Sequence, residues 1–233
     1  GTGKTSLMVN IIRCLRRAGI GVEEILLGAP TGRAAQRMTE SVQYNINTIK
    51  EPSEGDEELL SLKGSTLHKI LRYQSYNHDF YYRETNPLPA SVIILDEVSM
   101  VDVVMMEKFL RAVDPSRTKL IFLGDKDQLS SVEAGAVFAE MIPDGIRAER
   151  FKGRLTVLEK VYRSGANLLG LAKQINRGIR PAYSTLPFNS ALQLKPDKWA
   201  FVQNNGIRAW RDHIRLWTEY HYLRPMHGDS RSF

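Results

Sequence analysis

Short apolar runs alternate along the chain with longer segments in which apolar residues recur every three or four positions. A short continuous run is typical of a buried strand, and the longer period is typical of an amphipathic helix. The pattern predicts strands at 25–29, 92–96, 120–124 and 155–158. It predicts helices at 4–18, 32–41, 66–73, 103–113, 134–141, 166–177 and 207–220. This alternation favours an α/β fold, with a sheet flanked by helices.

Two connecting stretches differ from the rest in composition. Residues 51–58 read EPSEGDEE and are expected to form a solvated acidic loop. Residues 73–89 are rich in tyrosine and end in NPLP. Their aromatic rings, beside Arg72 and Arg83, are suited to stacking on nucleic-acid bases. A small hairpin packed on the domain surface explains the same residues, and both interpretations stay open.

Composition narrows the class of protein. Of the 233 residues, 42% are hydrophobic and 25% are charged, and the single cysteine, Cys14, leaves no pair for an internal disulfide. No apolar run approaches the roughly 20 residues of a membrane span. These features predict a cytoplasmic protein without a membrane partner. The net charge of +6 and the pI of about 9.4 suit a polyanionic partner, although many unrelated enzymes share them.

The chain opens with GTGKTS, the back half of the phosphate-binding pattern G-x-x-x-x-G-K-[ST]. Glycines let backbone N–H groups curl around phosphate oxygens, and the following helix adds the positive end of its dipole. Lys4 is expected to reach the β- and γ-phosphates of ATP, and the Thr5 hydroxyl to ligate Mg²⁺. The first glycine of the pattern and the strand that feeds it are expected before Gly1. The predicted nucleotide-binding residues are Gly1, Thr2, Gly3, Lys4, Thr5 and Ser6.

Two predicted strands end in residues suited to phosphoryl transfer. The run VIILDE ends in Asp96 and Glu97, at the carboxyl edge of the sheet where ligands of open α/β folds bind. Asp96 is expected to hold Mg²⁺ through water, and Glu97 to orient and deprotonate the attacking water. The next strand leads to Gln128, whose amide can bond both the γ-phosphate and that water. Without their neighbours, these residues would be a helix-entry acid pair and a turn.

A further candidate is Arg163, which follows the last predicted strand in the segment LEKVYRS. An arginine from a neighbouring lobe can neutralise charge on the transferring phosphoryl group when a cleft closes. Spacing alone does not show that Arg163 reaches the site, and Arg154 and Arg177 are equally basic.

Six segments occur together in an order that carries a family resemblance. They are GTGKT, APTGRAAQRMTES, STLHKILRY, NPLPASVIILDEVSMVD, LIFLGDKDQLSSVEAGAVF and LEKVYRSGANLLGLAKQINRG, over about residues 1 to 181. In this order they resemble the RecD-like superfamily 1 DNA helicases, the exodeoxyribonuclease V alpha subunit family. The resemblance implies an ATP- and Mg²⁺-dependent helicase with two RecA-like lobes. It also implies 5′ to 3′ movement on single-stranded DNA and a role in DNA recombination and repair.

The same resemblance implies a set of DNA-backbone contacts. The residues concerned are Thr31, Arg33, Ser65, Thr66 and His68. Hydroxyl and backbone donors at helix starts hold phosphates without reading the base sequence. Local explanations compete with this one, because Thr31 and Ser65 can cap the helices that follow, and His68 can be a satisfied polar residue.

The resemblance also divides the chain. Residues 1–154 are expected to form RecA-like lobe 1A without its first strand, with a small hairpin insertion around 73–89. Residues 155–233 are expected to begin lobe 2A and to stop before motifs V and VI of the family. Ser130 stands where family members usually have proline.

Two levels of activity follow from this division. The 233 residues themselves are expected to show little or no ATPase. The full-length protein is expected to be a DNA-stimulated ATPase that works alone or with RecB- and RecC-like subunits. The alternatives are the helicase portion of a conjugative relaxase, and a DNA-binding or structural module that does not hydrolyse ATP.

Overall fold

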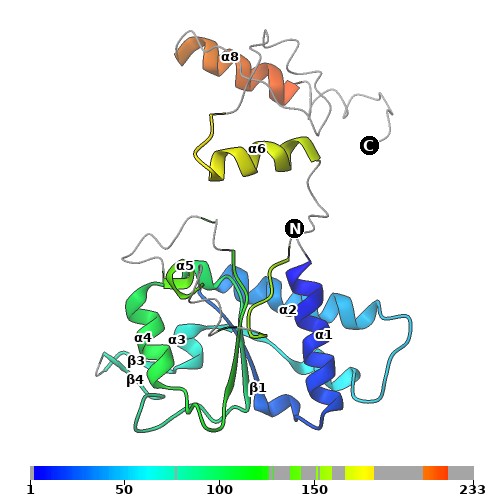
Figure 1. Cartoon of the computed structure of the whole chain (residues 1–233), viewed down its shortest axis with the longest axis vertical. Coiled ribbons are helices and arrows are strands. Elements are labelled where there is room, and N and C mark those ends of the chain that lie inside the picture. Colours follow the sequence, from blue (N-terminus) through cyan, green and yellow to red (C-terminus); the bar gives the residue numbers. More distant parts are fainter. Residues whose placement is uncertain are drawn as a thin grey trace. The chain divides into compact units, whose positions relative to one another are not determined.

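The computed structural model describes residues 3–76, 78–125, 128, 137–142, 151, 153–158, 166–180 and 207–219. The chain divides at residue 160 into two compact units, whereas the sequence predicts a boundary after residue 154. In the second unit, Val161–Phe233, the described elements are α6 (Ala166–Asn176) and α8 (Ile207–Thr218) (Figure 1). The first unit, Thr2–Lys160, holds the sheet and most of the candidate site.

A parallel sheet with the strand order β2-β1-β5-β6 forms the centre of the first unit. The strands are β1 (Ile25–Ala29), β2 (Gly64–Thr66), β5 (Val92–Leu95) and β6 (Lys119–Phe122). The helices are α1 (Lys4–Arg17), α2 (Gly32–Asn47), α3 (Leu67–Ile70), α4 (Val103–Arg111) and α5 (Val137–Met141). Figure 1 shows α1 and α2 on one side of the sheet and α3 and α4 on the other. The predicted α/β class is therefore confirmed.

The apolar side chains form two clusters, one on each face of the sheet. Val92 and Ile94 pack in the cluster that holds the buried residues of α1 and α2. Ile93 and Leu95 pack in the other, with the buried residues of α3 and α4. Successive side chains of a strand point to opposite faces, so β5 is buried on both sides. This double burial explains why its sequence is a continuous apolar run.

The structure contains one strand that was not predicted, and two predicted elements are shortened or missing. β2 was not predicted, because Gly-Ser-Thr carries no apolar signal. The predicted helix 66–73 is reduced to α3, and Arg72, with φ 53, turns the chain into the next strand. Residues 155–158 form no strand: Leu155 is 41% exposed and Val157 69%. Since no neighbouring strand pairs with them among the described residues, strand-forming residue types do not suffice.

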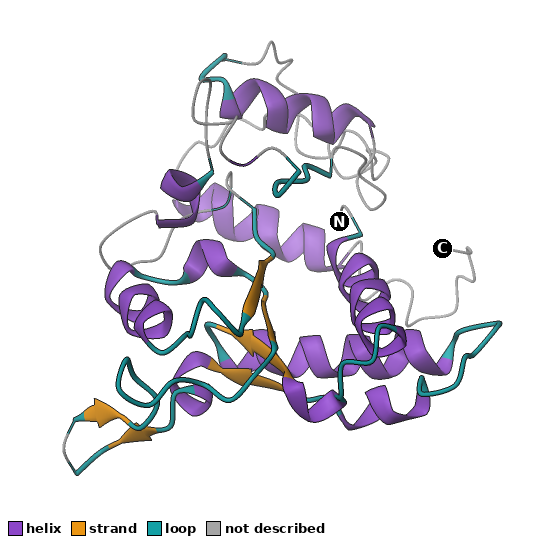
Figure 2. Ribbon diagram, turned by 60° about the horizontal axis from the view of Figure 1, so that its bottom comes forward, coloured by secondary structure: helices purple, strands orange, loops and turns teal. Residues whose placement is uncertain are grey.

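The tyrosine-rich stretch contains a small antiparallel hairpin. β3 (Tyr73–Gln74) pairs with β4 (Asp79–Phe80), with Tyr73 opposite Phe80. Figure 2 shows these two short strands apart from the four-stranded sheet. Phe80 is buried, and its ring lies 5.4 Å from that of Tyr73. This aromatic contact therefore joins the two strands of the hairpin at its base.

The acidic stretch 51–58 is mostly exposed, as its composition predicts, but it contains one buried carboxylate. Asp56 is only 4% exposed. Its carboxylate accepts hydrogen bonds from Arg13 Nε (2.9 Å) and Nη2 (2.8 Å) on α1, and from the backbone N–H of Ser53 (2.8 Å). Arg16 of α1 pairs with Glu58 of the short 3-10 helix η2 (Glu57–Ser61). The acids therefore fasten this stretch to α1.

In the part of the chain that the structure describes, no helix has both the length and the apolar composition needed to cross a bilayer.

Candidate functional site

α1 begins at the carboxyl edge of the sheet, as a phosphate-binding helix requires. Gly3 precedes it with φ 83 and ψ 13, in the left-handed region that favours glycine. The Lys4 ammonium donates a hydrogen bond to the backbone carbonyl of Gly124 (3.2 Å), just after β6. The lysine therefore lies beside the end of the strand that leads to Gln128. Thr5 and Ser6 follow in the first turn, and the predicted Gly1 and Thr2 lie outside the described residues.

The two predicted catalytic carboxylates come directly after β5. The backbone N–H of Asp96 still bonds to the Gly28 carbonyl of β1 (2.9 Å), so the sheet fixes its position. Its carboxylate accepts a hydrogen bond from the backbone N–H of Glu97 (2.8 Å). Burial raises the pKa of Asp96 above its ordinary value, although the hydrogen bond from Glu97 and the charge of Lys4 both oppose that shift. A positive charge at this site would stabilise the carboxylate further.

Glu97 is strained and incompletely satisfied. Its backbone has φ 54 and ψ 38, a left-handed conformation that costs a non-glycine residue about 1–3 kcal/mol. Its Oε2 atom is buried and has no hydrogen-bond partner among the described residues. A glutamate in this state persists only where surrounding structure imposes it, and such positions cluster at functional sites.

Gln128 lies close to the segment that follows Glu97. That segment is the 3-10 helix η3 (Val98–Met100). Its residue Ser99 donates a hydrogen bond from the side-chain hydroxyl to Gln128 Oε1 (3.4 Å). The backbone N–H of Val98 bonds to the Leu123 carbonyl (3.1 Å). The structure thus brings Lys4, the acid pair and Gln128 to the ends of β5 and β6, while Arg163 lies outside the described residues.

These residues fit a nucleotide with Mg²⁺. The helix start after left-handed Gly3 and the Lys4 ammonium suit phosphate oxygens. The buried Glu97 oxygen and the carboxylate of Asp96 suit a cation and a water. No group of three or more His, Cys, Asp or Glu side chains could hold a metal ion in the described ranges. A Mg²⁺ ion is usually bound through one or two carboxylates together with substrate phosphates.

The predicted DNA-contacting residues lie at the same edge of the sheet, where the neighbouring strands β1 and β2 end, and Ser65 and Thr66 are the last two residues of β2. Thr66 pairs in register with Ala29, two residues before Thr31. The Thr31 side chain accepts from the backbone N–H of Ala34 (3.2 Å) and caps α2. Thr66, rather than Ser65, caps α3, by accepting from Lys69 N–H (3.3 Å). The capping alternative thus holds for Thr31 and is wrong for Ser65.

Arg33 and His68 have exposed side chains. Arg33 is the second residue of α2. The His68 ring packs near the rings of Tyr73 (6.1 Å between centroids) and Phe80 (5.8 Å). His68 is therefore part of the aromatic group at the base of the hairpin.

A groove of about 480 Å³ runs beside β2. It is lined by Gly32, Ala35, Gln36, Thr39, Glu40, Lys63, Gly64, Ser65, Thr66 and Lys69. α2 approaches β2 so closely that a Cβ on Gly64 would lie 2.4 Å from the Ala35 carbonyl oxygen, so this position requires glycine. Lys63 and Lys69 are exposed and add positive charge to a groove that already contains two of the predicted DNA contacts.

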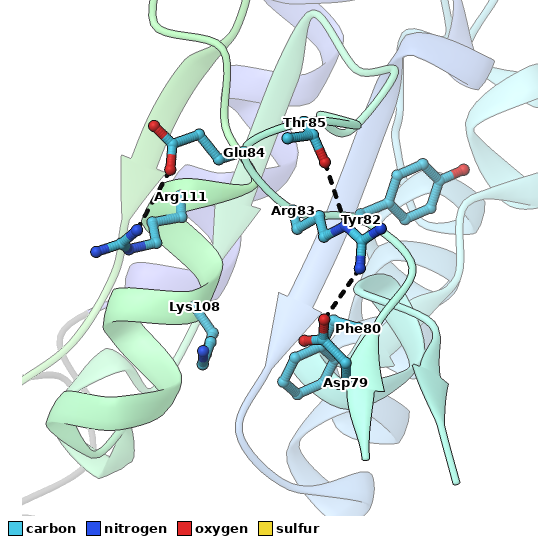
Figure 3. Close-up of a pocket in the computed structure, with 8 residues that line it drawn as sticks. All are labelled: Asp79, Phe80, Tyr82, Arg83, Glu84, Thr85, Lys108 and Arg111. Atoms are coloured by element: carbon cyan, nitrogen blue, oxygen red, sulfur yellow. Dashed lines mark hydrogen bonds and ion pairs between the residues drawn. The ribbon is translucent and has the colours of Figure 1, made fainter. Parts of the chain in front are cut away.

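A cavity of about 390 Å³ separates the hairpin from α4 (Figure 3). Arg111 of α4 bonds to Glu84 (3.3 Å), and Arg83 bonds to Asp79 (3.0 Å). The Arg83–Asp79 pair lies within the hairpin region, and the exposed Arg111–Glu84 pair links α4 to the segment that follows β4. This geometry agrees with the surface-hairpin interpretation of the tyrosine-rich stretch.

A family model described as AAA domain matches residues 1–134, more than half of the chain. The chain belongs to this AAA domain family. The matched range includes every described candidate for the nucleotide site, from Gly3 to Gln128.

Three relatives connect this AAA domain with the proteins RecD and RecD2. The RecBCD enzyme subunit RecD of Haemophilus influenzae is 40% identical over 144 residues, 60% of this chain and 22% of that protein. The RecBCD enzyme subunit RecD of Mycolicibacterium smegmatis is 37% identical over 183 residues, 76% of this chain and 32% of that protein. The ATP-dependent RecD2 DNA helicase of Deinococcus radiodurans is 28% identical over 201 residues, 84% of this chain and 23% of that protein.

These relatives confirm the resemblance to RecD-like helicases that the motifs indicate. The chain spans between about a fifth and a third of their lengths.

Sequence reasoning missed three residues of the AAA domain that the geometry adds to the site. Ser99 contacts Gln128 across 29 positions of sequence, and nothing in DEVSM marks a contact at that distance. Lys63 and Lys69 flank the segment STLHK that carries the predicted DNA contacts. The positive charge of these two lysines beside that segment could have indicated that they contact DNA phosphates.

Proposed function

We propose that this chain provides the ATP-hydrolysing lobe of a RecD-like DNA helicase. The observation that carries the proposal is the meeting of Lys4, Asp96, Glu97 and Gln128 at the carboxyl ends of β5 and β6. Proteins named RecD and RecD2 helicase are among the relatives, which supports the same activity. Residues 155–233 would begin a second RecA-like lobe, from which Arg163 would act.

In this proposal each residue has one task. Bound Mg²⁺-ATP would supply the transferable phosphoryl group and a divalent charge. Lys4 and the N–H groups at the start of α1 would hold phosphate oxygens, and Thr5 and Asp96 would hold the metal. Glu97 would accept a proton from the attacking water through its buried carboxylate. Gln128 would orient that water and respond to the nucleotide state.

The edge formed by β1 and β2 would carry single-stranded DNA. Hydroxyls of Thr31, Ser65 and Thr66, with Arg33 and His68, would hold the backbone, and Lys63 and Lys69 would add phosphate contacts. β1 pairs with β5, and β2 pairs with β1, so a shift at the nucleotide can reach the DNA edge through neighbouring strands of one sheet. In the full-length protein the movement would run 5′ to 3′, alone or with RecB- and RecC-like subunits, in recombination and repair.

The test is ATP hydrolysis by the full-length protein, measured with and without single-stranded DNA. Lys4→Ala removes the phosphate-binding ammonium, and Glu97→Gln removes the general base. Each variant is expected to lose DNA-stimulated turnover. For Glu97→Gln the loss should be at least about 100-fold, the usual size of a general-base contribution.

Glu107→Gln is the matched control. Glu107 lies on α4, outside the site, and pairs with Arg111. This variant is expected to hydrolyse ATP as the wild type does. Turnover preserved in Lys4→Ala or Glu97→Gln would overturn the site assignment.

A further inference from the structure

Three polar residues are buried in the described part of the chain, and the partner of each indicates its role. Asp56 bonds to Arg13, and the Thr118 hydroxyl donates to the Ala90 carbonyl (2.7 Å). Arg13 and Ala90 are residues of the fold that have no proposed role in the chemistry. Ser99, 7% exposed, donates its hydroxyl hydrogen to Gln128 Oε1. Its partner is the residue that the proposed function places beside the reacting phosphate.

Ser99 itself is held firmly. η3 begins directly after the strained Glu97, and its first N–H bonds to the Leu123 carbonyl at the end of β6. Leu123 N–H in turn bonds to the Leu95 carbonyl of β5 (2.8 Å). The serine hydroxyl is therefore fixed to the same two strand ends that carry the acid pair and Gln128. A flexible glutamine side chain gains a rigid partner from this arrangement.

The bond also distinguishes the two ends of the Gln128 amide. The amide has an oxygen that accepts hydrogen bonds and an NH₂ group that donates them. When Ser99 occupies the oxygen, the NH₂ group is the end left to donate. Phosphate oxygens only accept, so a residue that contacts phosphate must present a donor.

We propose that Ser99 is a positioning residue that sets the orientation of the Gln128 amide, so that its NH₂ group faces the nucleotide. This inference rests on the proposed function, because it acts through Gln128. It couples the segment after Glu97 to Gln128 by a side-chain contact, in addition to the backbone bonds of the sheet.

A double-mutant cycle in the full-length protein tests the proposal by DNA-stimulated ATP hydrolysis. Ser99→Ala is expected to lower kcat by about 2- to 10-fold, the effect of one ordinary hydrogen bond, with KM for ATP little changed. Gln128→Ala is expected to lower kcat further. In the Gln128→Ala background, Ser99→Ala is expected to have no additional effect on kcat, because its partner is gone.

Thr118→Val is the matched control for loss of a buried hydroxyl. It removes the bond to Ala90 and is expected to lower thermal stability without changing kcat. An unchanged kcat in Ser99→Ala, or equal losses in the presence and absence of the Gln128 side chain, would overturn the role of Ser99 and leave the proposed function standing. An unchanged kcat in Gln128→Ala would instead overturn the role of Gln128 in the proposed function, and the Ser99 inference with it.

Discussion

Two acidic segments of the first unit keep carboxylates from water in opposite ways. In the stretch 51–58, Asp56 receives hydrogen bonds from a bidentate arginine and from Ser53. The hydrogen bonds from Arg13 hold the pKa of Asp56 well below its ordinary value, against the effect of burial. At the end of β5, burial dominates and raises the pKa of Asp96. The neighbouring Glu97 leaves one buried oxygen without a partner among the described residues.

The difference separates residues that serve the fold from residues that serve the chemistry. A buried carboxylate with a complete set of donors is already stabilised and has little to gain from a ligand. A carboxylate buried with few donors costs stability until a cation or a proton compensates it. Of these two segments, the end of β5 is therefore the one that a bound metal and water would stabilise more.

The largest effect on the free energy of unfolding is expected at Asp56, the residue that serves the fold. Asp56→Ala leaves the Arg13 guanidinium, 17% exposed, without its main partner. Breaking such a pair from one side costs roughly 3–5 kcal/mol. The free energy of unfolding, measured by denaturant titration of the full-length protein, is expected to fall by that amount.

Glu58→Ala provides the matched control in the same stretch. Glu58 also pairs with an arginine of α1, but its side chain is 51% exposed. Exposed pairs contribute about 0–1 kcal/mol. Equal losses of stability in Asp56→Ala and Glu58→Ala would contradict the view that Asp56 is the buried anchor.

A smaller effect is expected in the pH dependence of stability. The folded-state pKa of Asp56 is lowered relative to the unfolded value of about 3.9. Its contribution is therefore complete above about pH 5 and is lost as pH falls through the unfolded and then the folded pKa. The difference in unfolding free energy between wild type and Asp56→Ala should narrow between about pH 5 and pH 2. A difference that is constant or widens over that range would argue against a depressed pKa.

Much of the sheet could be predicted from the sequence, because its central strands are short apolar runs. β1 was predicted at its observed bounds, and β5 and β6 within two residues at each end. The positions of Asp96 and Glu97 followed, since the residues after a parallel strand lie at the carboxyl edge. Local pattern also placed the start of α2 and its cap, Thr31.

What the sequence did not predict depends on contacts between distant residues. Asp56 is buried because Arg13, 43 positions earlier, reaches it from α1. The left-handed backbone of Glu97 has no local signal, since glutamate ordinarily avoids that conformation. β2 is a strand because β1 pairs with it, and its own residues are polar or glycine. Such features need the folded chain to bring the partners together.

Asp96→Asn tests the comparison between the two acidic segments most directly. Asp96→Asn removes a buried charge while keeping the shape of the side chain. Thermal unfolding of the full-length protein, wild type and variant, is followed with a non-hydrolysable ATP analogue in the presence and absence of Mg²⁺. Without ligand, the variant is expected to be more stable by about 0.5–2 kcal/mol, as is common when a functional residue is neutralised.

With the nucleotide analogue, the wild type is expected to gain a Mg²⁺-dependent stabilisation of about 3 kcal/mol at a ligand concentration 100 times the Kd. The Asp96→Asn variant is expected to lose most of that Mg²⁺-dependent part. A variant that is less stable than the wild type without ligand, yet gains the same Mg²⁺-dependent stabilisation, would show that Asp96 serves the fold and would contradict the account.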